Sequence, residues 1–98
     1  MKYKIAICDD ADADRHYILN RVRAWASSAG HTVDIEDFPS AESFLFRYAE
    51  ESDYDILLLD VEMGGMDGVT MAKELRKTND TVQIVFITGY SDYISEGY

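Results

Sequence analysis

The sequence predicts an α/β domain in which helices cover both faces of a parallel sheet. Three observations support this fold class. Short apolar runs alternate with stretches of helical periodicity four times along the chain, which is the pattern of repeated strand–helix units. Turn residues separate most of these runs from the helical stretches. The chain has 98 residues, which is enough for one domain with a single hydrophobic core.

The first predicted unit is a strand followed by a long helix. Residues 3–8 form an apolar run, as expected of a strand, and the run is followed by two aspartates. A helix is predicted over residues 11–28, with Asp12 or Asp14 as its N-cap and Gly30 at its end. Its apolar face is expected to contain four residues at helical spacing: Ile18, Val22, Trp25 and Ala29.

The second unit begins with an amphipathic strand. Residues 32–38 alternate between polar and apolar side chains, which indicates a half-exposed strand at the edge of a sheet. Ser40 then fits the N-cap position of a second helix. The apolar residues of that helix are Phe44, Leu45 and Tyr48.

The third and fourth units contain the most apolar strands. Residues 56–60 are four apolar residues and a final aspartate, as expected of a strand buried on both faces. After a glycine pair, Asp67 is predicted to cap a third helix that ends near residue 77. Residues 82–87 predict a fourth strand, which ends at Thr88, and a last helix is expected to begin shortly afterwards.

The four strands are expected in the order 2-1-3-4, which is the flavodoxin-like arrangement. The amphipathic second strand suits an edge, whereas the apolar first and third strands suit the centre of the sheet. In this order the carboxyl ends of the first and third strands are neighbours. Asp9, Asp10 and Asp60 are therefore expected to meet in one crevice, with Thr88 beside them.

Three carboxylates in one crevice repel one another unless a cation or protons intervene. A site made only of oxygen ligands favours a hard ion such as Mg²⁺, and the two histidines of the chain are solitary, which argues against zinc. A carboxylate beside Mg²⁺ can also accept a phosphoryl group. The alternative is that Asp9 and Asp10 only begin a solvated helix, Asp60 caps a loop, and Thr88 is only a strand former.

Composition excludes several classes of function. Nine basic residues against nineteen acidic ones give a net charge of −10, so this segment is not expected to contact nucleic acid directly. No stretch is long and apolar enough to span a membrane, and the first residues lack the apolar region of a signal peptide. The lone Cys8 lies in an apolar run, as expected of a core residue. A cytoplasmic location with no membrane partner is expected.

Four linked segments resemble the receiver domain of bacterial two-component response regulators. They are ICDD at residues 7–10, LLLDVEM at 57–63, MDG at 66–68 and ITG at 87–89. The match covers essentially the whole chain, and four motifs in register are far more specific than one. The segment at residues 88–93 also resembles regulators in which the receiver precedes a LytTR-type DNA-binding domain.

The resemblance implies a role for each site residue. Asp60 would be the phosphoacceptor, receiving its phosphoryl group from a phosphohistidine on a sensor histidine kinase. Asp9 and Asp10 would hold Mg²⁺, with Asp60 and the backbone carbonyl of Glu62 as further ligands. Thr88 would be the switch hydroxyl that relays phosphorylation to an output domain, expected to be transcriptional and absent from these residues. The family hydrolyses its own acyl phosphate, so no turnover of an external substrate is expected.

The chain departs from the family pattern in two places. Gly64 stands where the family commonly has a proline, so a more mobile loop is expected after Asp60. Residues 1–98 are expected to be a receiver domain without its fifth strand and last helix, which places the family's lysine beyond Tyr98. Two consequences are expected: self-association through the uncovered strand at residues 82–87, and weakened or absent phosphorylation, since no lysine is available to balance the acyl phosphate. The alternative function is an interaction or dimerisation fragment of the same fold that cannot be phosphorylated.

Two other classes with related features fit the sequence less well. A phosphatase with an aspartate nucleophile needs a second acid two residues later, which Glu62 offers, but a catalytic lysine and a cap are missing. A flavin-binding module needs a loop after the first strand that accepts phosphate. The acidic residues 9–12 would repel one.

Overall fold

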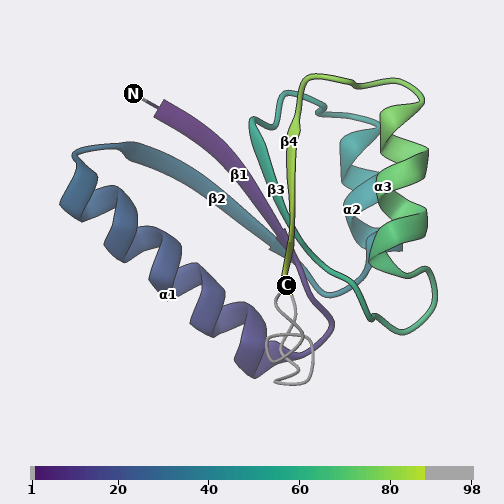
Figure 1. Cartoon of the computed structure of the whole chain (residues 1–98), viewed down its shortest axis with the longest axis horizontal. Helices are drawn as coiled ribbons and strands as arrows, with labels where there is room; N and C mark the ends of the chain where they lie inside the picture. Colours follow the sequence, from purple (N-terminus) through teal and green to yellow (C-terminus); the bar gives the residue numbers. More distant parts are fainter. Residues whose placement is uncertain (1, 88–98) are drawn as a thin grey trace.

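A computed structural model describes residues 2–87 as a parallel sheet of four strands with three helices (Figure 1). The strands are β1 (Lys2–Cys8), β2 (Thr32–Phe38), β3 (Ile56–Asp60) and β4 (Gln83–Ile87). The helices are α1 (Asp12–Ala29), α2 (Ala41–Tyr48) and α3 (Gly68–Arg76). The strand order is β2-β1-β3-β4 and every pair is parallel. The predicted fold class and the predicted order 2-1-3-4 are confirmed.

The helices cover both faces of the sheet, as predicted. In Figure 1, α1 lies on one face, whereas α2 and α3 lie on the other. The second face contains the main hydrophobic core, because alternate residues of β1 and β3 point toward the same helices. The fully buried members of this core are Ala6, Cys8, Ala41, Phe44, Leu57, Leu59 and Met71. Phe44 of α2 also makes an edge-on contact with Phe38 at a centroid distance of 5.3 Å.

Local capping explains where two of the helices begin. The Ser40 hydroxyl accepts a hydrogen bond of 3.0 Å from the Ser43 N–H at the start of α2. The Asp67 carboxylate accepts one of 2.7 Å from the Thr70 N–H at the start of α3. Each cap satisfies a backbone donor that the first helical turn leaves without a partner. Both predicted N-caps are therefore present.

Helix α1 differs from the prediction at its start and on its apolar face. Its N-cap is Ala11, so neither Asp12 nor Asp14 caps the helix, and both lie within the first turn. Ile18 and Val22 are half-buried and Ala26 is buried, but Trp25 is 44% exposed and Ala29 is exposed. Positions 18, 22 and 26 are four residues apart, so they share the stripe that faces the sheet. The Trp25 ring instead lies against Tyr3 and His31, at centroid distances of 6.1 and 5.1 Å.

None of the helices within residues 2–87 combines the length and the apolar character needed to cross a membrane. The longest of them, α1, has 18 residues. It carries charged side chains along its length, among them Asp12, Arg15, Arg21 and Arg23.

Register positions the acidic residues at one edge of the sheet. Cys8 pairs with Leu59 across β1 and β3, so the residue after each of them leaves the same carboxyl edge. Asp60 also pairs with Ile87 of β4. Thr88, which was expected beside them, and the helix expected after it lie outside the described residues.

Strand β4 pairs only with β3 among the strands of residues 2–87. Val85 and Phe86 are each 48% exposed, whereas Val82, which was expected to begin the strand, is buried just before it. Backbone groups on the open side of such a strand can pair with another chain. Self-association through this edge stays a prediction.

Candidate functional site

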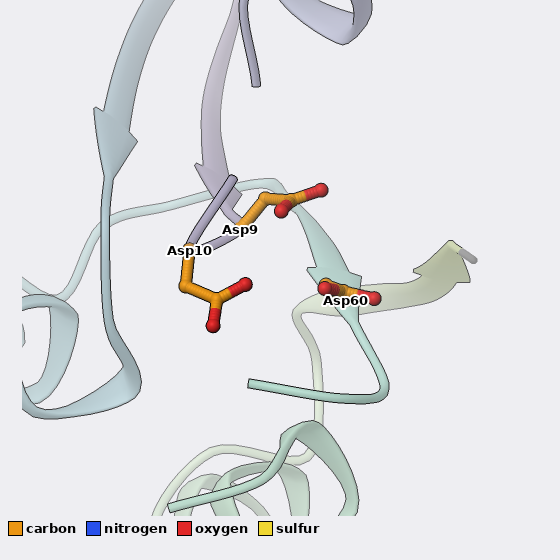
Figure 2. A group of neighbouring side chains, drawn as sticks. All are labelled: Asp9, Asp10 and Asp60. Carbon is orange, nitrogen blue, oxygen red and sulfur yellow. The ribbon is translucent and has the colours of Figure 1, made fainter. Parts of the chain in front are cut away.

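Three carboxylates converge at the carboxyl edge of the sheet, as the predicted strand order requires. Each of Asp9, Asp10 and Asp60 offers an oxygen atom, and these atoms all lie within 4.8 Å of one another. Figure 2 shows the side chains from the end of β1 and the end of β3 around a common space. Asp9 is 3% exposed and Asp60 is 8% exposed, whereas Asp10 is exposed to solvent. Two buried acids and one accessible acid thus share one crevice.

Backbone hydrogen bonds hold the two carboxylates of the β1–α1 loop in place. Asp9 Oδ1 accepts a hydrogen bond of 2.9 Å from the Ala11 N–H, which closes a short turn. Asp10 Oδ2 accepts one of 2.9 Å from the Gly64 N–H, fifty-four positions further along the chain. Each carboxylate has a second oxygen, so both retain acceptor capacity for a ligand in the crevice.

The pKa values of the two buried carboxyl groups are both raised above the usual value for aspartate. Burial raises the pKa of Asp60 from 3.8 to about 6, the neighbouring Asp9 charge adds to the rise, and a hydrogen bond from the Glu62 backbone opposes it. Burial also raises the pKa of Asp9, while the hydrogen bond from Ala11 opposes the change. Because burial and neighbouring like charges both disfavour ionisation, the crevice favours a proton or a cation among these oxygens.

The Asp60→Asn variant is expected to be more stable than the original protein at about pH 7 without divalent ions, by on the order of 2 kcal/mol. The folded state has the higher Asp60 pKa, about 6 against 3.8, so it binds more protons than the unfolded state between these values. The free energy of unfolding therefore falls as pH rises through this window. Urea unfolding of both proteins at about pH 4 and about pH 7 measures the difference in their free energies of unfolding. A constant difference between variant and original at both pH values would contradict the prediction.

The loop after β3 passes close to the crevice. It contains Glu62, which is exposed, and the glycine pair Gly64 and Gly65. The greater mobility expected of this loop stays a prediction. In the structure Met63 is 9% exposed in the core, and the Gly64 N–H donates to Asp10. The loop is closed by a hydrogen bond of 2.9 Å from the Gly68 N–H to the Val61 carbonyl.

Two charged residues that the sequence patterns did not single out also shape the site. Arg15 donates from Nη1 to the Asp9 carbonyl at 2.9 Å and forms ion pairs with Asp12 and Asp37 at 2.6 and 2.9 Å. It thereby fixes the turn that carries the first two acids. Glu42, in the first turn of α2, accepts a hydrogen bond from the loop after β3. The Asp37 partner of Arg15 and the Met66 partner of Glu42 come from distant segments, so the sequence near each residue does not indicate these two contacts.

Comparisons with known proteins agree with this geometry. The chain matches the response regulator receiver domain family over residues 5–97. It is 32% identical over 93 residues to the regulatory protein VanRB of Enterococcus faecalis, which covers 94% of this chain and 38% of VanRB. The structure of response regulator TrrA from Thermotoga maritima in complex with Mg²⁺-BeF aligns with a TM-score of 0.73 and 29% identity, covering 99% of this chain and 77% of TrrA.

A solved complex of histidine kinase ThkA with TrrA contains a further similar chain. The alignment has a TM-score of 0.70 and 29% identity, and it covers 95% of this chain and 73% of the other. By contrast, the chain spans only 9%, 37% and 39% of the length of three curated relatives that it matches. The family match over nearly all of the chain, the sheet order and the acidic crevice lead to one conclusion. The chain belongs to the response regulator receiver domain family, whose members act in two-component signalling.

Proposed function

We propose that residues 1–98 are a receiver domain in which Asp60 accepts a phosphoryl group with the help of Mg²⁺. The observation that carries the proposal is the convergence of Asp9, Asp10 and Asp60 within 4.8 Å. The donor set fits the ion, because carboxylate oxygens with accessible solvent are what Mg²⁺ prefers in proteins. Asp9, Asp10 and Asp60 would hold it, with the backbone carbonyl of Glu62 as the fourth protein ligand.

The proposed reaction is a transfer between two side chains. An Asp60 carboxylate oxygen attacks the phosphorus of a phosphohistidine, the P–O bond forms, and the P–N bond breaks. The electron pair returns to the imidazole, which takes up a proton. When bound, Mg²⁺ neutralises charge on the phosphoryl oxygens. With a pKa of about 6, Asp60 is largely ionised at neutral pH, and a nearby cation would stabilise the ionised form further.

The partner we propose is a sensor histidine kinase. Support comes from TrrA, a similar structure that was solved in complex with the histidine kinase ThkA. Thr88 would act as the switch hydroxyl and relay phosphorylation to an output domain, for which we propose a role in transcription. With a net charge of −10, this segment would leave nucleic-acid contacts to that domain. The domain would lose its phosphoryl group by hydrolysis and would not turn over an external substrate.

Incubation with Mg²⁺ and a small phosphodonor such as acetyl phosphate tests the proposal. Intact-protein mass spectrometry should show the addition of one phosphoryl group, and Asp60→Asn should remove it entirely because the nucleophilic oxygen is lost. Asp80→Asn, which changes an exposed aspartate in the turn before β4, is the matched control and should be labelled normally. Failure of the original protein to be labelled would favour the alternative of an interaction fragment that cannot be phosphorylated.

A further inference from the structure

The loop between β3 and α3, residues 61–67, is attached to the rest of the domain by two acidic side chains, one from the β1–α1 loop and one from α2. Asp10 accepts from the Gly64 N–H at 2.9 Å, and Glu42 Oε2 of α2 accepts from the Met66 N–H at 3.3 Å. The Asp10 contact comes from a residue of the crevice itself. The Glu42 contact comes from outside the crevice, and no step of the proposed function uses it.

Gly65 makes room for the Glu42 contact. A Cβ atom at this position would lie 2.6 Å from Glu42 Oε2, which is closer than real side chains allow. Gly65 also has a φ of 77°, in the left-handed region that glycine adopts without steric cost. Two separate features of one residue, its backbone conformation and its lack of a side chain, therefore bring the loop up to Glu42.

We infer that Glu42 is a positioning residue that holds the β3–α3 loop over the acidic crevice. The inference rests on the proposed function, because this loop carries the Glu62 carbonyl and the Gly64 N–H that is bonded to Asp10. With Met63 buried in the core and Met66 bonded to Glu42, the residues between them are held at both ends. Release of the Met66 end frees Gly64, and with it the Asp10 carboxylate that its N–H binds, to move relative to Asp60.

Glu42 also lies in the first turn of α2, where a negative charge stabilises the helix whatever the loop does. Charge and hydrogen bonding can be separated by substitution. Glutamine removes the charge and keeps an oxygen that accepts from the Met66 N–H, whereas alanine removes both. A role in helix stability predicts that the two variants behave alike, and a role in holding the loop predicts that glutamine restores the original behaviour.

The first measurement is amide hydrogen exchange by NMR without metal. Glu42→Ala should accelerate exchange of the Met66 amide by roughly three- to tenfold, which is the factor expected when a typical hydrogen bond is lost. In Glu42→Gln the Met66 amide should exchange at a rate within about twofold of that in the unsubstituted protein. Glu50→Ala, which removes an exposed acid just after the same helix, is the matched control and should leave the Met66 amide unchanged. An unchanged Met66 amide in Glu42→Ala would overturn the inference.

The second measurement is Mg²⁺ affinity, followed through the amide shifts of Gly64. Glu42→Ala should weaken binding by roughly threefold, and Glu42→Gln should restore it. Equal Mg²⁺ affinity in Glu42→Ala and the original, despite faster Met66 exchange, would overturn the positioning role. If the original protein itself gave no response to Mg²⁺, the proposed function would fail, whereas the exchange data would still decide whether Glu42 holds the loop.

A third variant tests the geometry from the opposite side. Gly65→Ala places a methyl group against Glu42 Oε2 and should displace it, so Met66 exchange should rise at least as much as in Glu42→Ala. Because the two changes act on one contact, the double variant should exchange more slowly than the product of the two single effects predicts. Fully multiplicative effects would show that the two residues act independently and would overturn the inference.

Discussion

Replacing Gly68 with alanine should destabilise the domain by about 3–5 kcal/mol. Gly68 is buried at the first position of α3, and its N–H donates to the Val61 carbonyl at 2.9 Å. A Cβ atom there would overlap the backbone carbonyl oxygen of Asp60 and crowd its carbonyl carbon at 3.0 Å. These are backbone atoms of a central strand, so the clash cannot be relieved by rotating a side chain. A decrease of this size is a large part of the free energy of unfolding of a typical domain, which is roughly 5–15 kcal/mol.

Urea unfolding followed by circular dichroism measures this effect. Gly64→Ala is the matched control, because a Cβ atom at Gly64 would meet only Asp10 Oδ2 at an ordinary distance of 3.7 Å. That variant should stay within about 1 kcal/mol of the original, and the reduced freedom of its unfolded chain favours a small gain. Equal stability of the two variants would mean that α3 can move away from β3 without cost, contrary to the packing described above.

Asp10→Asn should weaken Mg²⁺ binding by roughly 30-fold. Two unit charges about 4 Å apart attract by about 1 kcal/mol in bulk water, and a divalent ion doubles this, which gives about 2 kcal/mol for each carboxylate charge removed. Asparagine keeps an oxygen that can accept from the Gly64 N–H, so the contact at 2.9 Å is retained and the change isolates the charge.

Isothermal titration calorimetry at constant ionic strength measures this difference in affinity. Asp14→Asn is the control, because Asp14 is an exposed acid in the first turn of α1 that lies outside the group of three converging carboxylates. It removes the same charge from the same part of the surface, so its effect should be within about threefold, as expected for screened charges. Equal losses in both variants would indicate that Mg²⁺ responds only to the overall acidity of the domain.

The sequence was sufficient to predict the elements and their order because both depend on local patterns. The alternation of residues 32–38 indicated an edge strand, and the apolar run at 56–59 indicated a central one; the sheet order followed from these two assignments. The convergence of Asp9, Asp10 and Asp60 was then predictable, since parallel strands that are neighbours end at the same edge. Helix α1 was predicted less well, because periodicity alone did not show which apolar stripe would face the sheet.

The sequence by itself thus determined the fold class, the strand order and the three acids that share the crevice. Only the tertiary structure decided how those acids are held and how strongly they interact. The contacts of Arg15 with Asp9, of Glu42 with Met66, and the fit of Gly68 beneath Asp60 depend on distances between side chains and backbone that no periodic pattern encodes. The raised pKa of Asp60 has the same origin, because burial and the approach of a second charge exist only once the chain has folded.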